Sequence, residues 1–151
     1  QAWGYGAYLV MLSIEAGTGI ASIEKVACVD DTGRIINPDL VKGQIQGGFA
    51  QGLGEALMEQ IIYDEDGQLL TGSFMDYAMP RAQDVPKVDM HTFETPSPLN
   101  ALGAKGVGEA GTIGAPPAIL NAAIDALRPL GATIHQTPMT PTRILAALGH
   151  S

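Results

Sequence analysis

One acidic residue, Glu109, stands in a loop of glycine and small apolar residues within GAKGVGEAGTIGAPPAILNAAIDAL, which runs from Gly103 to Leu127. A glycine loop ahead of a helix is typical of an anion site, because backbone N–H groups and the positive end of the helix dipole face the ligand. A carboxylate in the middle of such a loop would repel a phosphate. The residue types alone leave open what chemistry Glu109 serves.

Gly106, Gly108 and Gly111 match the Gly-x-Gly-x-x-Gly fingerprint of dinucleotide-binding domains. That fingerprint requires a strand directly before it, a helix that begins within it, and an acidic residue at the end of a second strand. Here the preceding ETPSPLNALGAKG is predicted as a loop, and Pro116 and Pro117 place the helix start after the glycines. A dinucleotide-binding domain is therefore a disfavoured alternative, which titration with NAD or FAD would test.

The composition describes a folded, acidic chain. Its 151 residues, of which 46% are hydrophobic, are enough for one domain with a sizeable core. The formal net charge of −8 argues against nucleic acid, whose binding depends on clustered Lys and Arg. We therefore expect no nucleic-acid partner.

The single cysteine, Cys28, lies in IEKVACVDD, where it is predicted to occupy a buried strand position as a structural thiol. One Cys and three His cannot supply a four-ligand zinc or iron–sulfur site. No metal-ligating residue is predicted in this chain.

The first residues, QAWGYGAYLVMLSIEAG, contain no initiator Met, no basic segment and no small-residue cleavage site. They are predicted to be neither a signal peptide nor a membrane span. We expect a piece of a larger, cytoplasmic polypeptide, with residues 1–151 as a single segment.

Two strands are expected at Tyr5–Glu15 and Ile20–Asp31, where apolar and β-branched residues flank the turn AGTG. Asn37 followed by Pro38 predicts a helix start. The sequence after this helix predicts a hairpin in IIYDEDGQLLTGS with its turn at Asp66 and Gly67, and then a strand in KVDMHTFET.

Two further helices are expected near the C-terminus. The first is predicted from Pro116 to about Leu127, with one buried face made by Ile119, Leu120, Ala123, Ile124 and Leu127. The last is predicted to be capped by Thr140, to begin at Pro141 and to end at Gly149. The fold class is α+β: mixed strands and hairpins packed with one long glycine-rich helix and two C-terminal helices.

The long helix, NPDLVKGQIQGGFAQGLGEALMEQ, has an unusual glycine content, with Gly43, Gly47, Gly48, Gly52 and Gly54. Each interior glycine costs about 0.5–1 kcal/mol relative to alanine. Something must therefore approach the helix closely. Tight helix packing and a cofactor or neighbouring chain against the bared backbone are both compatible with the pattern.

Four blocks carry a resemblance over nearly the whole chain: INPDLVKGQIQGGFAQGLGEAL, YDEDGQLLTGSFMDYAMPRAQDVP, ETPSPLNALGAKGVGEAGTIGAPPAILNAAIDAL and TPMTPTRILAAL. In order and spacing they resemble the C-terminal part of the molybdopterin-binding large subunit of the xanthine dehydrogenase, aldehyde oxidoreductase and aerobic carbon monoxide dehydrogenase family. The resemblance implies part of a molybdenum-cofactor-binding domain.

The resemblance also implies roles for particular residues. Glu109 matches the family glutamate that stands beside molybdenum without ligating it and acts as base toward the metal-bound hydroxide. Gln44 matches the family glutamine that hydrogen-bonds the molybdopterin, since a side-chain amide both donates and accepts. Gly106, Val107 and Gly108 match the loop whose backbone contacts the cofactor. Lys105 is left without a role, since it could meet either a phosphate or an acidic neighbour.

The implied function is that of a molybdenum hydroxylase, which uses water to hydroxylate an aldehyde, an N-heterocycle or a similar small molecule. The implied cofactor is molybdopterin in its cytosine dinucleotide form, with iron–sulfur clusters and FAD on other domains or subunits. The partners are therefore the remainder of the molybdenum subunit, the iron–sulfur and flavin subunits, and the substrate.

Segments that supply most pterin contacts and the substrate pocket in the family have no counterpart in this chain, so it is expected to be inactive by itself. The copper-carrying cysteine role of carbon monoxide dehydrogenases does not transfer to Cys28, which lies in a predicted strand. A non-catalytic assembly or binding module with the same fold is the alternative.

Overall fold

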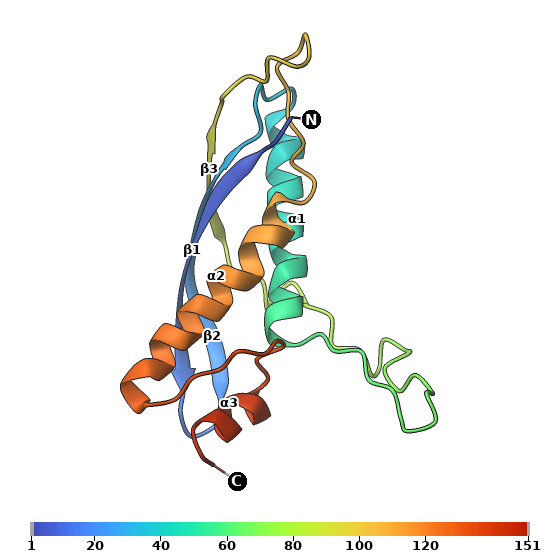
Figure 1. The fold of residues 1–151 in the computed structure, drawn as a ribbon, viewed down its shortest axis with the longest axis vertical. Coiled ribbons are helices and arrows are strands. Elements are labelled where there is room, and N and C mark those ends of the chain that lie inside the picture. The colour runs from blue at the N-terminus through green and yellow to red at the C-terminus, as the bar shows by residue number, and fades with distance from the viewer. Residues whose placement is uncertain (1, 151) are drawn as a thin grey trace.

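The computed structural model describes residues 2–150 and shows a three-stranded sheet with helices packed on one face (Figure 1). Strands β1 (Tyr5–Glu15) and β2 (Ile20–Asp31) form an antiparallel pair with Tyr5 opposite Asp31, and β3 (Val88–Phe93) pairs with β2 in parallel. All three predicted strands are confirmed, and the α+β class with them. The sheet is mixed because β3 returns to β2 through a helix, which parallel pairing requires.

Helix α1 (Pro38–Leu57) provides this connection. The Asn37 side chain caps it by accepting hydrogen bonds from the backbone N–H groups of Asp39 and Leu40, and Pro38 occupies the first turn. The predicted start is confirmed, since the cap satisfies donors that the helix itself cannot.

Helix α2 (Ala110–Leu127) begins six residues before the predicted start, so the expectation of a start at Pro116 was wrong. Pro116 and Pro117 lie inside the helix, although proline cannot donate to the preceding turn. The first turn is held instead by α1: the Thr112 hydroxyl donates to the Gly48 carbonyl at 3.2 Å. Tertiary contact has thus overridden the local preference of the sequence.

The chain ends in a short 3₁₀ turn, η1 (Arg128–Leu130), and helix α3 (Pro141–Ala147). The Thr140 hydroxyl accepts a hydrogen bond from the Arg143 N–H, and Gly149 follows the helix with φ of 81°. The predicted signals of this helix are confirmed.

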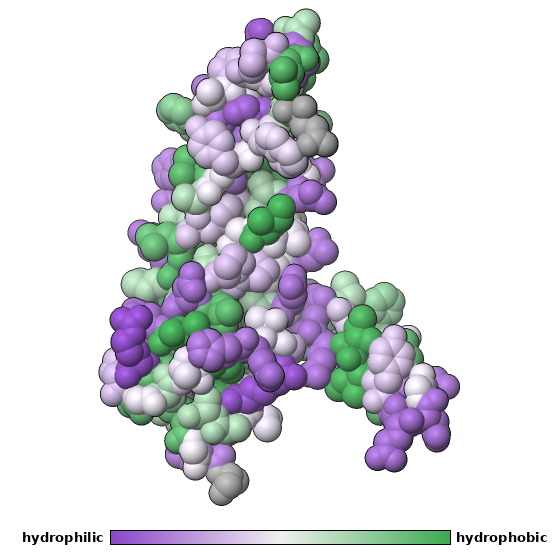
Figure 2. Space-filling model, viewed as in Figure 1, coloured by the Kyte–Doolittle hydropathy of each residue, from purple (hydrophilic) through white to green (hydrophobic). Residues whose placement is uncertain are grey.

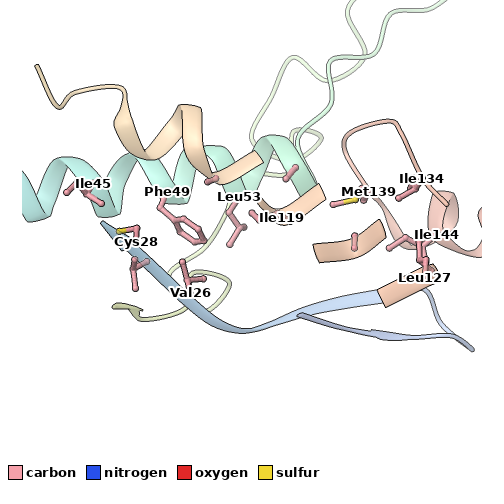
Figure 3. Packing of buried hydrophobic residues seen from close by; sticks show 14 of the residues in the cluster. Val26, Cys28, Ile45, Phe49, Leu53, Ile119, Leu127, Ile134, Met139 and Ile144 are labelled. Carbon is pink, nitrogen blue, oxygen red and sulfur yellow. The ribbon is translucent and has the colours of Figure 1, made fainter. Parts of the chain in front are cut away.

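The core lies between the sheet and the two long helices. In Figure 3, Phe49 and Leu53 of α1 and Ile119 of α2 gather over Val26 and Cys28 of β2. A second part of the same cluster lies toward the C-terminus and includes Leu127, Ile134, Met139 and Ile144. Of the face predicted for α2, Ile119, Ala123 and Leu127 are fully buried, and Leu120 and Ile124 are partly buried.

The segment between α1 and β3 extends away from the body as an arm, residues 58–87 (Figure 1). The predicted turn is present, with Gly67 at φ of 81°, but the predicted hairpin strands are not: a single bridge joins Tyr63 and Leu69. An isolated two-stranded hairpin has no core to pack on and is marginal. Apolar side chains are visible on the arm in Figure 2, and Phe74 and Met75 are about nine-tenths exposed.

Candidate functional site

A cleft of about 390 Å³ lies where the start of β1, the end of β2 and the loop before α2 meet. Gly106, Gly108 and Glu109 line it from the loop, and Tyr8, Asp30 and Thr32 line it from the strands. The structure therefore places three of the predicted site residues at one cavity.

Glu109 is the N-cap residue of α2, but its carboxylate does not cap the helix. The side chain is exposed and lies in the cleft lining. The positive end of the α2 dipole attracts a negatively charged group at this position. Its carboxylate is available to accept a proton from a group in the cleft.

The loop before Glu109 is fixed to the end of β2 through Lys105. The Lys105 backbone N–H donates to the Thr32 carbonyl at 2.9 Å, and its ammonium lies 3.1 Å from Asp31 Oδ2. The structure thus gives Lys105 an acidic neighbour of this chain, the second of the two partners that the sequence left open.

Asp31 is buried and accepts further hydrogen bonds, through Oδ1, from the backbone N–H groups of Gly33 at 2.8 Å and Thr95 at 3.1 Å. Burial by itself raises the pKa of this carboxyl, but the bonds from Thr95, Gly33 and Lys105 outweigh it and hold the pKa well below its usual range. Asp31 therefore carries a full negative charge in the fold.

Asp30, its neighbour, is equally buried but has a different environment. The Tyr8 hydroxyl donates to Asp30 Oδ2 at 2.8 Å, and no cation compensates for the lost water. Burial raises the pKa of Asp30, and burial together with the Asp30 carboxyl raises the pKa of Tyr8. This pair was not predicted, because only the register that sets Tyr8 opposite Cys28 brings it together.

Thr32 bears on whether a ligand fits here. Its hydroxyl Oγ1 is buried and has no hydrogen-bond partner among residues 2–150. A buried polar atom without a partner is costly in a folded protein. Because Thr32 belongs to the cleft lining, a polar ligand in the cleft is a candidate partner for this hydroxyl.

Glycines leave room for such a ligand. A Cβ atom added at Gly106 or Gly108 would have open space around it. The first turn of α2 adds backbone N–H groups at the same wall, where no side chain caps them. A cleft with open glycines, an unpartnered hydroxyl and a carboxylate fits a bulky cofactor rich in hydrogen-bonding groups.

Gln44 does not line the cleft. It is exposed on α1, next to Ile45, whose carbonyl lies against Gly111 near the start of α2. The position is therefore adjacent to the loop that carries Glu109. Gln51, also on α1, lies with its side-chain oxygen 3.3 Å from the Thr112 hydroxyl.

The Val107 side chain packs against the core, and Val107 is absent from the cleft lining. Cys28 is buried as predicted, and burial followed by the effect of Asp30 raises the pKa of its thiol to about 11. Such a thiol is protonated at neutral pH and is a poor nucleophile.

None of the helices within residues 2–150 combines the length and apolar character needed to cross a bilayer. Within that part of the chain, no three His, Cys, Asp or Glu side chains are grouped so as to hold a metal ion.

The dinucleotide fingerprint also has the wrong context. Helix α2 does begin within it, contrary to expectation, but no strand precedes it directly: β3 ends at Phe93, and residues 94–109 form a loop with one isolated bridge at Ala104. The three glycines are thus not part of a strand–turn–helix unit.

Comparison with known proteins agrees with the geometry. Residues 1–86 match the family described as molybdopterin cofactor-binding domain. The nicotine 6-hydroxylase large subunit of Paenarthrobacter nicotinovorans is 44% identical over 142 residues, which cover 94% of this chain and 17% of that protein.

Solved structures give the same result. The chain superimposes on quinoline 2-oxidoreductase from Pseudomonas putida 86 with a TM-score of 0.87 and 44% identity, over 90% of this chain and 17% of that one. For the CO dehydrogenase from Oligotropha carboxidovorans the TM-score is 0.91 with 38% identity, over 97% of this chain and 18% of that one. The chain thus spans less than a fifth of the length of these relatives. It belongs to the molybdopterin-binding large-subunit family of the xanthine, aldehyde and carbon monoxide oxidoreductases.

Proposed function

We propose that this chain forms one wall of the catalytic site of a molybdenum hydroxylase, with Glu109 as the general base. The observation that carries the proposal is the position of Glu109: an exposed carboxylate in the lining of the cleft, on a loop of open glycines at the start of α2. The family supports a molybdenum oxidoreductase.

The cofactor we propose is molybdopterin in its cytosine dinucleotide form, which when bound supplies a redox-active metal that activates water for hydroxylation. Gly106 and Gly108 would admit it close to the backbone, because no Cβ occupies that space. The Gln44 amide and the Thr32 hydroxyl would offer hydrogen bonds, and Val107 would contribute its backbone. None of these residues would ligate the metal.

Glu109 would then accept the proton of the activated water at a carboxylate oxygen. This role explains why the loop carries an acid where a phosphate-binding loop would not. The exposed, uncapped carboxylate can approach a group in the cleft without breaking a contact of its own helix. A positioned base of this kind contributes about 10² to 10⁴ in rate.

We further propose that the substrate is an aldehyde, an N-heterocycle or a similar small molecule, and that electrons pass to iron–sulfur and flavin groups elsewhere in the enzyme. Two relatives are named for N-heterocyclic substrates, nicotine and quinoline. The remaining parts of the site would come from the rest of the subunit, because the relatives are more than five times as long as this chain.

The test is Glu109→Gln in the complete enzyme. Glutamine keeps the size and polarity of the side chain but cannot take up the proton. We expect reduction of the metal by substrate to slow by about 10⁴-fold or more, which corresponds to roughly 5 kcal/mol of transition-state stabilisation. Molybdenum content should stay the same.

The matched control is Glu94→Gln, a carboxylate in the loop after β3 that does not line the cleft. It should keep normal turnover. Near-normal turnover in Glu109→Gln would contradict the base assignment and favour a non-catalytic assembly module of the same fold.

A further inference from the structure

The Lys105–Asp31 pair is a buried ion pair beside the proposed base that the mechanism does not use. The Lys105 side chain is 10% exposed and the Asp31 side chain 1% exposed. The Lys105 ammonium also lies 5.2 Å from the centre of the Tyr5 ring, on the cleft side of β1. The pair thus joins residues 74 positions apart at the wall of the cleft.

Such a pair fixes geometry more than it adds net stability, since burying two charges offsets most of their attraction. Asp31 directs its two oxygens at different segments. Oδ2 receives Lys105, and Oδ1 receives the backbone of Gly33 and Thr95. The Asp31 carboxylate therefore ties the loop before α2 to the end of β2 through side chains, beside the backbone bonds from Lys105 N–H to the Thr32 carbonyl and from Arg34 N–H to the Gly103 carbonyl.

Glu109 is four residues from Lys105, and two of the three residues between them are Gly106 and Gly108. Glycine gives this short stretch unusual backbone freedom, and a Cβ added at Gly106 or Gly108 would meet no atom within 4 Å. The next anchor is Thr112, whose hydroxyl donates to α1. Between Lys105 and Thr112 the Val107 side chain packs against the core, so the stretch that carries Glu109 is held at its two ends and at Val107.

We propose that Lys105, held by Asp31, is a positioning residue for Glu109. It keeps the glycine loop against the strand end, so that the carboxylate stays at the cleft wall. The inference rests on the proposed function of Glu109 as base, and it adds a residue that acts on catalysis without touching substrate or cofactor. A base that is displaced by about 1 Å loses much of its effect on rate.

The experiment uses three variants of the complete enzyme. Lys105→Met removes the charge and leaves Asp31 without its cation, which endangers folding. Lys105→Met/Asp31→Asn removes both charges together and avoids that penalty. Lys105→Arg keeps a cation at the same place. Arg128→Gln is the control, because it breaks an exposed ion pair with Asp125 of similar length, 3.0 Å, at the far end of α2.

Two measurements are made on each. The first is steady-state kinetics, in which the double variant should lose at least tenfold in kcat with KM within twofold, because substrate binding is not altered. The second is amide hydrogen exchange of residues 106–110, with and without cofactor, which should become faster in the double variant. Lys105→Arg should keep the kcat and the exchange rate of the parent enzyme, and Arg128→Gln should change neither of these quantities.

The proposal is overturned if the double variant folds with kcat within twofold of the parent, or if exchange in residues 106–110 is unchanged. A structural role alone would lower the melting temperature without separating kcat from KM. Failure of the proposed function gives a different result. Normal turnover in Glu109→Gln would contradict the assignment of Glu109 as base, and the positioning role of Lys105 would then be contradicted as well. The exchange data would still report whether the ion pair holds the loop.

Discussion

The crossing of α1 and α2 and the mouth of the cleft both depend on glycine, but in opposite ways. At the crossing, a Cβ on Gly48 would lie 3.0 Å from the Gly111 Cα and the Thr112 N, and one on Gly52 would lie 2.8 Å from the Ala115 Cβ. At the cleft, Gly106 and Gly108 face open space. Glycine at the crossing serves packing, whereas at the cleft it keeps a volume free.

The same division runs along α1 itself. Gly47 and Gly43 have nothing within 4 Å of an added Cβ, although Gly48 is the next residue after Gly47. Tight packing therefore explains the glycines on the face of α1 that meets α2. A cofactor or neighbouring chain against the open face, which carries Gln44, stays a prediction.

The largest effect on the free energy of unfolding is expected at the Lys105–Asp31 ion pair in the cleft wall. Asp31→Asn leaves the Lys105 ammonium buried without its partner, so the chain should lose about 3–5 kcal/mol of unfolding free energy. Denaturant unfolding followed by circular dichroism measures it. A loss below about 1 kcal/mol would mean that the wall is held by something other than charge.

The pH dependence has a defined sign. Because the folded-state pKa of Asp31 is lowered, its contribution is complete above about pH 4, its ordinary pKa, and is lost as the pH falls further. Asp30, with a raised pKa, contributes in the opposite direction. Asp30→Asn should therefore steepen the loss of stability in acid, and Asp31→Asn should flatten it. Equal slopes in the two variants would contradict the assignment.

The second-largest effect on the free energy of unfolding is expected at the crossing of α1 and α2. Gly111→Ala would place a Cβ against the Ile45 carbonyl and the Phe49 N, which are backbone atoms that cannot rotate away. We expect a loss of about 1–3 kcal/mol by overpacking, measured in the same unfolding experiment. If alanine is tolerated here, the two helices are not in backbone contact.

A third, smaller effect on the free energy of unfolding has the opposite sign. Gly47→Ala lies on the open face of α1 and should stabilise the chain by about 0.5–1 kcal/mol, since alanine favours the helix and meets no atom. Gly48→Ala is its matched partner, one residue away, and should destabilise. Destabilisation by both variants would erase the distinction between the two faces.

The smallest effect on stability is expected in the cleft loop. Gly108→Ala should leave the unfolding free energy within about 0.5 kcal/mol, as for a surface substitution. In the complete enzyme, however, the methyl group would occupy the space proposed for the cofactor. Metal analysis of the purified enzyme should therefore show a reduced molybdenum content, and full occupancy would mean that the cofactor lies elsewhere.

Much of the fold was predictable because its signals are local. Runs of apolar and β-branched residues around a turn indicate β1 and β2, and caps such as Asn37 and Thr140 mark helix starts within three residues of themselves. The first turn of α2 was missed because its support comes from Gly48, 64 residues earlier in the chain.

The same limit of local sequence signals applies to the candidate site. Gly106, Gly108 and Glu109 could be predicted to lie close together, since they fall within four residues of one loop, although their chemical role came from resemblance. The unpartnered Thr32 hydroxyl, the Tyr8–Asp30 bond and the Lys105–Asp31 pair depend on tertiary placement. No local pattern in the sequence indicates that these particular side chains meet.

The parallel pairing of β3 with β2 has a consequence for the order in which the chain folds. The β1–β2 hairpin is complete at Asp31, but Val88, the partner of Val26, emerges from the ribosome only after α1 and the whole arm. Closing so long a loop is entropically costly and slow. The apolar face of α1 must also wait for α2 before it is covered. During synthesis, therefore, the newly made chain exposes apolar surface until α2 has been made, and the cleft, whose wall includes the start of α2, can form only after that.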